Sequence, residues 1–360
     1  MLYVQLGTRS FAGIERVVDS VCAELAKTYP SEFDVDVLIV SKHENYPPEP
    51  HAYNVVRKSG MSKLGLIGAY RSTVRSKKYD LVVVPQIETT VIFWFAQIGL
   101  SQRIALHLHG NPRRENTHIK ARILFFLFRY LVMPRIAAVF GTSPRQLQSF
   151  AADFGCDKTM VWVPNPVRSF EPPAPNDNPV FGIITFVNVG RFDYQKGQEI
   201  LIDAFCELHA IRRNSRLRLV GYGKDEKALA EQIDRLGLSG IVTLESHPDN
   251  PKHALYGSDV FVATSRWEGW SLAICEALRC GLPVISTDCE FGPSDILVDL
   301  RLGRLVPQDD MAALVNVMTY YCDNIAEERS HSDFRRRNID QYSVENIVKV
   351  HAAAIKNAAA

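Results

Sequence analysis

The feature that most constrains the fold of this chain is an order of strand, loop and helix that begins twice. Leu2 to Leu6 reads as a strand, a glycine-containing loop follows over Gly7 to Gly13, and a helix is expected from about Ile14 to Tyr29. The same order begins again with a strand over Ile183 to Val189. The strand over Asp80 to Val84 is apolar almost throughout, which is typical of parallel sheets covered by helices on both faces. The chain is therefore predicted to be an α/β protein with two Rossmann-like domains.

The length of the chain agrees with two domains, because 360 residues exceed one ordinary hydrophobic core. The segment from Phe170 to Pro179 contains four prolines and no apolar periodicity, so it is interpreted as a linker. We expect an N-terminal domain over residues 1–170, a linker over 171–179 and a C-terminal domain over 180–342. The tail, 343–360, is predicted to be helical from about Val344.

Composition limits the class of protein. Hydrophobic residues make up 46% and charged residues 22% of the chain, the balance of a globular protein, and a net charge of +1 does not indicate a nucleic-acid partner. The seven cysteines include no C-x-x-C pair and no zinc-ligand spacing, which indicates buried thiols in a reducing compartment. No secretory signal is recognised, and no apolar run approaches the ~20 residues that span a bilayer. A cytoplasmic protein is expected.

The stretch richest in chemistry runs from Ser265 to Ile296 and reads SRWEGWSLAICEALRCGLPVISTDCEFGPSDI. We interpret it as loop, helix, turn and strand, with Glu268 in the loop and Glu276 on the helix. The first helical N–H groups, near Gly269 to Leu272, would lack intrahelical partners and favour an anion. Carboxylates beside an anion are expected to accept hydrogen bonds from hydroxyls instead. Hydroxyls together with phosphate suggest a sugar nucleotide.

Two cations follow the strand that opens the second half of the chain. Arg191 and Lys196 stand in the sequence G-R-F-D-Y-Q-K-G, immediately before the N-terminus of a helix. In that position they could reach the oxygens of a diphosphate. The alternative is a solvated surface pair.

The motifs G-R-x4-K-G, E-G-x-S and E-x7-E occur in this order, and together they resemble the retaining glycosyltransferases of family 4, also described as glycosyl transferases group 1. The resemblance implies the GT-B fold, in which two Rossmann-like domains face an interdomain cleft and a C-terminal helix packs back across both. It implies that the C-terminal domain holds the sugar nucleotide. The N-terminal domain would then hold the acceptor.

The resemblance also implies roles for single residues. Arg191 and Lys196 would neutralise the diphosphate, Glu276 would accept from the ribose hydroxyls, and Glu268 would accept from the sugar and hold its anomeric carbon in place. The family usually has two adjacent glycines in the first loop, where this chain has Ala12 and Gly13. The residues expected to bind the donor are Gly13, Arg191, Lys196, Glu268, Gly269, Trp270, Ser271, Leu272 and Glu276. No metal and no further cofactor is expected, since no D-x-D cluster follows a strand.

Two histidines mark the end of the strand over Ile104 to Leu108. Strand ends followed by Gly/Asn/Pro loops are where open α/β sheets place ligands. Alternation places His107 and His109 on the same side of the strand, and the break at Gly110 makes His109 the more exposed. The family often carries a histidine at the end of this strand. His109 is therefore predicted to be catalytic, together with Arg191, Lys196 and Glu268, whereas a structural role is preferred for His107.

The segment from Arg113 to Tyr130, RRENTHIKARILFFLFRY, is basic and rich in Phe and Leu. Such a composition can lie on an anionic membrane surface. The alternative is an ordinary helix whose apolar stripe packs in the core. Both interpretations stay open.

The expected reaction is retaining, metal-independent transfer of a hexose or N-acetylhexosamine from a nucleoside-diphosphate sugar to a glycan or lipid-linked glycan, in the synthesis of surface polysaccharide or glycoconjugate. The segment Cys289 to Ile296 resembles a version common in enzymes that use UDP-sugars, although Asp295 stands where Glu is more usual, so UDP is favoured over GDP. The alternatives are another GT-B enzyme, such as a sugar-nucleotide epimerase or a phosphorylase-like enzyme, and an inactive sugar-nucleotide-binding protein. An NAD-dependent dehydrogenase is disfavoured, because no G-x-G-x-x-G follows the first strand.

Overall fold

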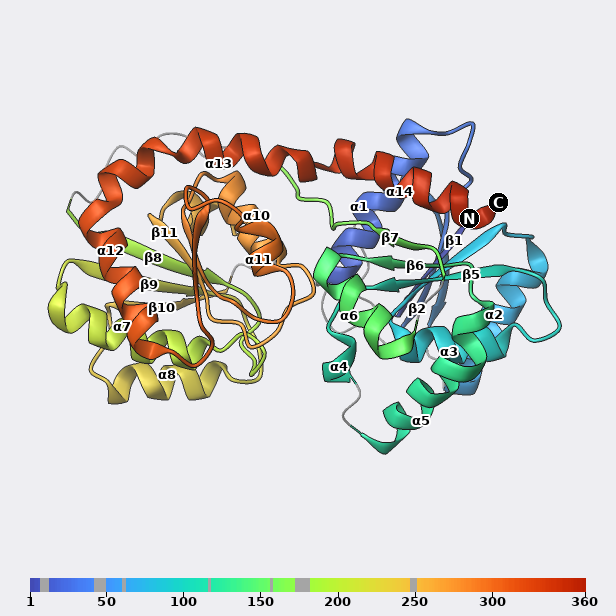
Figure 1. Ribbon diagram of the computed structural model, residues 1–360, viewed down its shortest axis with the longest axis horizontal. Helices are drawn as coiled ribbons and strands as arrows, with labels where there is room; N and C mark the ends of the chain where they lie inside the picture. The colour runs from blue at the N-terminus through green and yellow to red at the C-terminus, as the bar shows by residue number, and fades with distance from the viewer. Residues whose placement is uncertain are drawn as a thin grey trace. The chain divides into compact units, whose positions relative to one another are not determined.

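The chain divides into two compact units, each built around one parallel β-sheet (Figure 1). The computed structural model describes residues 1–6, 13–41, 50–59, 63–115, 118–155, 158–171, 182–246 and 251–360. The first unit comprises Met1–Pro166 with Tyr342–Ala360, and the second comprises Val167–Gln341. The prediction of two Rossmann-like α/β domains is confirmed. The predicted linker, 171–179, lies outside the described residues except for Glu171.

The first unit has a seven-stranded sheet in the order β3-β2-β1-β4-β5-β6-β7, with every pair parallel. The strands are β1 (Leu2–Leu6), β2 (Asp36–Ser41), β3 (Asn54–Ser59), β4 (Leu81–Pro85), β5 (Arg103–Leu108), β6 (Ala138–Gly141) and β7 (Met160–Trp162). The strand order reverses between β1 and β4, which is where doubly wound sheets place ligands. The loop after β1, predicted over Gly7 to Gly13, lies outside the described residues except for Gly13.

The helices of the first unit pack on this sheet or on one another. They are α1 (Gly13–Thr28), α2 (Lys63–Ser76), α3 (Ile87–Ala96), α4 (Pro112–Glu115), α5 (Ile119–Leu127), the π-helical turn η1 (Phe128–Val132), the 3-10 turn η2 (Met133–Arg135), α6 (Pro144–Phe154) and α14 (Val344–Ala359). The C-terminal helix α14 packs on α1 and against β4 and β5. The last helix of the chain therefore completes the unit that the first strand begins.

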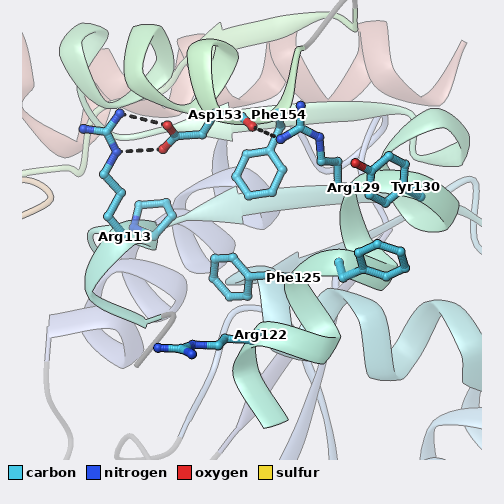
Figure 2. A pocket seen from close by; sticks show the side chains of 9 residues that line it. Arg113, Arg122, Phe125, Arg129, Tyr130, Asp153 and Phe154 are labelled. Atoms are coloured by element: carbon cyan, nitrogen blue, oxygen red, sulfur yellow. Dashed lines mark hydrogen bonds and ion pairs between the residues drawn. The ribbon is translucent and has the colours of Figure 1, made fainter. Parts of the chain in front are cut away.

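The basic segment predicted at Arg113 to Tyr130 forms α4, α5 and most of η1. Arg113 in α4 donates two hydrogen bonds of 2.8 Å to the carboxylate of Asp153 in α6, which fastens the start of the segment (Figure 2). Ala121 and Phe125 of α5 are buried in the core, as are Phe128 and Val132 of η1. The interpretation of a helix with an apolar stripe in the core is confirmed for this face.

The second unit has a six-stranded parallel sheet in the order β10-β9-β8-β11-β12-β13. The strands are β8 (Ile184–Val189), β9 (Ser215–Val220), β10 (Val242–Glu245), β11 (Val260–Ala263), β12 (Val284–Thr287) and β13 (Gly303–Val306). The order reverses between β8 and β11. The loops that follow these two strands carry the G-R-x4-K-G and E-G-x-S motifs, so the sheet brings both motifs to one edge.

Helices cover this second sheet as well. They are α7 (Gln198–Ile211), α8 (Glu226–Arg235), α9 (Lys252–Tyr256), α10 (Leu272–Arg279), α11 (Pro293–Ile296), α12 (Met311–Ser330) and α13 (Ser332–Ile339), with the 3-10 turn η3 (Asp340–Tyr342) leading to α14. Across the described ranges of both units, no helix combines the length and apolar character needed to cross a membrane.

The cysteines of the described residues are unpaired thiols, as predicted from their number and spacing. Cys22, Cys275, Cys280 and Cys289 are buried. Burial raises the pKa of Cys289 to about 12, so its thiol stays protonated at neutral pH. These side chains pack as small apolar groups.

The loops after β8 and β11 touch at Gly197. This residue caps the N-terminus of α7 with a φ of 62°, and a Cβ placed on it would lie 2.4 Å from the carbonyl oxygen of Thr264. The Thr264 hydroxyl donates back to the carbonyl oxygen of Gly197 at 2.8 Å. Only glycine combines the left-handed conformation with so close an approach. The contact holds the loop of Lys196 against the loop of Glu268.

Replacing Gly197 by alanine tests this approach, and Gly237 provides a matched control. Gly237 has a φ of 68°, and a Cβ on it would meet no heavy atom within 4 Å. We expect Gly237→Ala to lower the free energy of unfolding by about 1–2 kcal/mol, the cost of the left-handed conformation alone. Gly197→Ala should cost roughly 2 kcal/mol more, since the Thr264 backbone must also move. Urea unfolding measures both, and equal losses would show that the close approach is not constraining.

Candidate functional site

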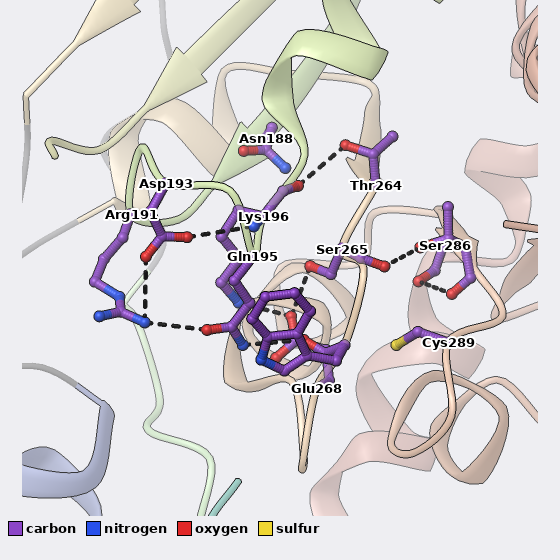
Figure 3. A network of polar contacts seen from close by, with 12 residues as sticks. Asn188, Arg191, Asp193, Gln195, Lys196, Thr264, Ser265, Glu268, Ser286 and Cys289 are labelled. Atoms are coloured by element: carbon purple, nitrogen blue, oxygen red, sulfur yellow. Dashed lines mark hydrogen bonds and ion pairs between the residues drawn. The ribbon is translucent and has the colours of Figure 1, made fainter. Parts of the chain in front are cut away.

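The structure joins the two motifs of the second unit through one ion pair. Lys196 lies in the loop between β8 and α7, and Glu268 lies in the loop after β11 (Figure 3). The Nζ atom of Lys196 lies 2.6 Å from Oε1 of Glu268. Their side chains are only 18% and 8% exposed. The two residues, which were predicted to bind separate parts of a donor, are therefore in direct contact with each other.

Glu268 has a second partner in its own loop. The hydroxyl of Ser265 donates to the same Oε1 atom at 2.7 Å. A buried carboxylate needs such compensation, because leaving water costs it several kcal/mol. One cation and one hydroxyl fix the rotamer of Glu268.

Arg191 is the exposed cation of the site. Its Nη2 atom lies 3.2 Å from Oε1 of Gln195 and 3.4 Å from a carboxylate oxygen of Asp193, and its side chain is 53% exposed. The backbone carbonyl of Arg191 accepts from the side-chain amide of Gln198, the first residue of α7, at 2.9 Å. The loop backbone is thus held while the guanidinium remains accessible.

Gln195 links the two loops. Its side-chain amide donates to the backbone carbonyl of Trp267 at 2.9 Å, and its backbone carbonyl accepts from the backbone N–H of Arg266 at 2.8 Å. Sequence analysis did not single out Gln195 or Ser265. The available signal was their position, since Gln195 lies inside the G-R-x4-K-G motif and Ser265 lies three residues before Glu268.

Helix α10 begins at Leu272, close to where the sequence placed it, with Glu268 before the helix and Glu276 within it. Ser271 is its N-cap residue, and its hydroxyl makes no capping hydrogen bond with the backbone. Gly269, Trp270 and Ser271 are buried in the loop that leads into the helix. Helix α10 therefore begins four residues after Glu268, and no capping side chain of the described residues binds its N-terminal N–H groups, which carry a partial positive charge.

A second loop packs on the entry to α10. A Cβ placed on Gly292, which has a φ of 92°, would lie 3.3 Å from the carbonyl oxygen of Gly269. Gly292 caps α11, and its N–H is 3.3 Å from the carboxylate of Asp295. The segment that resembles those of UDP-sugar enzymes therefore packs against the loop that leads into α10.

Glu276 is buried and has a partner that sequence analysis missed. Its Oε1 atom accepts from Nε of Arg168 at 2.6 Å. Arg168 directly follows the segment V-P-N-P-V, where no residue signalled an ion pair with a helix over a hundred positions later. The ribose role of Glu276 stays a prediction, and any such contact would share the carboxylate with Arg168.

The remaining predicted site residues belong to the first unit. Gly13 is the first residue of α1 and is exposed. His109 follows β5, and its ring lies 4.0 Å from that of His107, so the two are neighbours on one side as predicted. His109 is 9% exposed and His107 fully buried, so His109 is the more exposed of the two by a small margin.

The two histidines share a buried cluster with residues from both ends of the chain. The hydroxyl of Tyr3 in β1 forms a hydrogen bond with Nδ1 of His107 and lies 3.4 Å from Nε2 of His109. The ring of His351 in α14 lies 5.7 Å from that of His107. Burial lowers the pKa of His109 to about 3, with His351 adding to the effect, and it lowers the pKa of His351 to about 4. At neutral pH His109 is therefore an uncharged imidazole, able to exchange hydrogen bonds but not to act as a cation.

No cluster of three or more His, Cys, Asp or Glu side chains suited to a metal ion occurs in the parts of the chain that the structure describes.

The histidine cluster predicts a loss of stability in mild acid. The folded-state pKa values lie below the ordinary 6.5, so below that pH the unfolded chain binds more protons than the folded one. The free energy of unfolding should fall by roughly 1.4 kcal/mol per pH unit and per histidine between about pH 6 and pH 4. Urea unfolding across this range measures the slope.

A matched pair of variants tests whether the buried histidines cause this pH dependence of the free energy of unfolding. His351→Leu removes one buried imidazole and should make the dependence shallower by about one proton. His253→Gln removes an exposed histidine of the second unit and should leave the slope unchanged. A His351→Leu slope equal to that of the unmodified protein would contradict the assignment.

Comparison with protein families identifies both halves of the chain. Residues 12–166 match the model of the glycosyl transferase 4-like domain, and residues 179–338 match that of glycosyl transferases group 1. Among curated proteins, an uncharacterised glycosyltransferase of Methanocaldococcus jannaschii is 28% identical over 74% of this chain and 68% of its own length. A lipopolysaccharide 1,6-galactosyltransferase of Escherichia coli is 27% identical over 46% of each chain.

Solved structures share the fold over the whole chain. Sucrose-phosphate synthase from Thermosynechococcus elongatus superposes with a TM-score of 0.82 at 17% identity, covering 99% of this chain and 98% of that one. The Anabaena protein HepE in complex with UDP-glucose superposes with a TM-score of 0.79 at 20% identity, with the same coverage. At such identities the likeness concerns the fold alone.

Proposed function

Because the chain belongs to the family of glycosyl transferases group 1 and has the GT-B fold, we propose that it transfers a sugar from a nucleoside-diphosphate sugar. The transferred group is a hexose or N-acetylhexosamine, and the donor is a UDP-sugar rather than a GDP-sugar. The acceptor is a glycan or a lipid-linked glycan of a surface polysaccharide or glycoconjugate. The reaction retains the anomeric configuration and needs neither a metal nor a further cofactor.

The observation that carries this proposal is the Lys196–Glu268 contact of 2.6 Å beside the N-terminus of α10. A sugar nucleotide offers what each group lacks, since the diphosphate provides acceptors for the ammonium and the sugar provides hydroxyl donors for the carboxylate. Lysine has three N–H donors, of which Glu268 takes one. The others remain for phosphate oxygens.

The chemistry follows from the charges. As the bond between the anomeric carbon and the phosphate oxygen breaks, negative charge grows on the leaving diphosphate. Lys196, the exposed Arg191 and the N–H groups at Gly269 to Leu272 stabilise that charge without needing to reorganise. The acceptor oxygen forms its bond to the same face of the sugar, and its proton passes to the leaving phosphate oxygen.

The remaining residues position the reactants. Glu268 accepts from the sugar hydroxyls and orients the anomeric carbon, and Glu276 accepts from the ribose. Gly13 opens α1, where a small residue permits close approach of a ligand. His109, neutral at neutral pH, exchanges a hydrogen bond with a hydroxyl in the first unit. We propose it as the catalytic residue of that unit.

Two observations support a UDP-sugar as the donor. The loop over Cys289 to Ile296, which resembles those of UDP-sugar enzymes, packs on Gly269 at the entry to α10. HepE, whose structure holds UDP-glucose, shares the fold along nearly the full chain. The matched galactosyltransferase acts in lipopolysaccharide synthesis, which supports a glycan acceptor.

We place the enzyme in the cytoplasm, peripherally on the inner face of the membrane. The unpaired thiols fit a reducing compartment. A lipid-linked acceptor would be presented at that face.

The proposal is tested by measuring thermal stabilisation with a panel of UDP-, GDP-, ADP- and TDP-sugars. A true donor raises the melting temperature, because it binds the folded state. Transfer is then monitored through the release of the nucleoside diphosphate, and NMR gives the anomeric configuration of the product. Addition of a chelator should leave the rate of transfer unchanged. Interconversion of the sugar nucleotide would indicate an epimerase, pyridoxal absorbance a phosphorylase, and binding without release an inactive protein. Stabilisation by no sugar nucleotide would reject the proposal.

Arg191→Ala tests the phosphate role. The side chain is exposed, so its removal should not unfold the protein. Loss of a charge-assisted contact should weaken UDP binding about tenfold or more in calorimetry, while uridine, which lacks the diphosphate, binds unchanged. Arg235→Ala, at the end of α8, removes an exposed arginine of the same unit and serves as control. Equal weakening of UDP and uridine would exclude the phosphate assignment.

Glu276→Gln tests the ribose role by comparison of UDP with 2′-deoxy-UDP. If the carboxylate accepts from the 2′-hydroxyl, the variant should bind UDP roughly tenfold more weakly but lose little affinity for the deoxy ligand. If Glu276 acts only through its ion pair with Arg168, both ligands should lose affinity alike. The difference between the two ligands thus separates contact with the ribose from support of the fold.

A further inference from the structure

Helix α5 and the turn η1 have apolar side chains on two opposite faces. One stripe is buried in the core and the other lies in solvent. The outer stripe has four members, spaced four, three and four residues apart: Ile119, Ile123, Phe126 and Tyr130, which are 76%, 56%, 63% and 57% exposed. An ordinary surface helix carries polar residues on that face. The outer stripe has no role in the core.

The neighbouring helix α3 also has exposed apolar side chains. Helix α3 packs against α5 and η1. Eight of the fourteen exposed large apolar side chains in the described residues lie on or beside these three elements, which is too concentrated for scattered exposure. We call this set the apolar surface: Ile92, Phe95, Ile98, Ile119, Ile123, Phe126, Tyr130 and Leu131.

The charge around the apolar surface is positive. Between Glu88 and Asp153 the sequence has eight Lys or Arg residues and one acidic residue, Glu115. Four of these cations are exposed on α5, η1 and η2, namely Lys120, Arg122, Arg129 and Arg135. No carboxylate of the described residues forms an ion pair with any of the four. Their charge is available to an outside partner.

A pocket of about 470 Å³ adjoins the apolar surface between α4, α5, η1 and α6 (Figure 2). Aromatic rings line it, including those of Phe125, Phe126, Tyr130 and Phe154. The carboxylate of Asp153 is occupied by Arg113, and Arg129 donates to the Asp153 carbonyl at 2.8 Å. Arg122 also lines the pocket, as do Arg113 and Arg129, so the hollow combines aromatic rings with cations.

We propose that the apolar surface docks on an anionic lipid bilayer and that the pocket at Arg122 receives a lipid headgroup phosphate. Phe126 and Tyr130 suit the boundary between headgroups and acyl chains, and the long cations beside them can reach the phosphates. The exposed cations beside the apolar side chains favour an anionic bilayer, because basic residues at such a surface are attracted to anionic lipid headgroups while the apolar groups are buried at the acyl boundary. Docking on the membrane does not depend on the proposed function. Only the presentation of an acceptor by the membrane rests on it.

The test is co-sedimentation of the whole protein with vesicles of phosphatidylcholine alone and of phosphatidylcholine mixed with phosphatidylglycerol in roughly equal amounts. We expect binding to the anionic vesicles, little to the neutral ones, and release as salt is raised, because exposed charges are screened within a Debye length. Phe126→Ser should weaken binding on the order of tenfold through lost apolar burial. Lys120→Gln combined with Arg122→Gln should weaken binding to anionic vesicles by at least as much.

Matched controls come from the second unit. Leu300→Ser removes a side chain that is 67% exposed, and Arg235→Gln removes an exposed cation. Neither should change vesicle binding. All variants should keep the UDP affinity of the unmodified protein, and Arg191→Ala should keep its vesicle binding. Failure of membrane docking and failure of the donor site are thereby distinguished.

Three results would overturn the inference. Absence of binding to either vesicle would do so, as would equal binding by Phe126→Ser and the unmodified protein. The third is a concentration-dependent association of the protein with itself, seen by ultracentrifugation, that Phe126→Ser abolishes. That result would make the apolar surface an interface between copies of the chain.

Discussion

The candidate site of the second unit depends on the ion pair between Lys196 and Glu268. Neither charge could stay buried alone, because an unpaired ion in a protein interior costs several kcal/mol. Each therefore requires the other, and the strand order that brings the ends of β8 and β11 together is what makes the pair possible. Gly197, Gln195 and Ser265 then hold the two loops at the separation that the pair needs. Lys196 keeps two N–H donors that an anion can use without breaking the pair, and a sugar nucleotide can in addition offer hydroxyl donors to Glu268.

Much of the fold could be predicted from the sequence because its signals are local. The strand Leu2–Leu6 was predicted to the residue and the strand Ile184–Val189 to within one residue, and the last helix begins at Val344, about where it was expected. Apolar runs bounded by turn residues specify such strands. The strand Asn54–Ser59 was missed, because it lies at the edge of its sheet and carries polar residues at both ends. Edge strands need less apolar sequence than central ones.

The same distinction between local and long-range signals applies to the candidate site. Residue types inside the motifs, such as Arg191, Lys196, Glu268 and Glu276, could be predicted, because each motif is contiguous. Their partners could not. Arg168 reaches Glu276 across more than a hundred positions, and the pairing of Lys196 with Glu268 depends on strand order. The two apolar faces of α5 also required the structure, since periodicity alone does not tell which of them meets the core.

The place of α14 has a consequence for how the chain is made. This helix packs on α1, β4 and β5, and its His351 completes the buried cluster around Tyr3 and His107. The unit that begins first is thus the one whose core is closed last, after the contiguous second unit, Val167–Gln341, has been synthesised. Domains commonly fold in order as they leave the ribosome. Here the order of completion is reversed, and the emerging first unit must wait with part of its sheet uncovered until the end of the chain arrives.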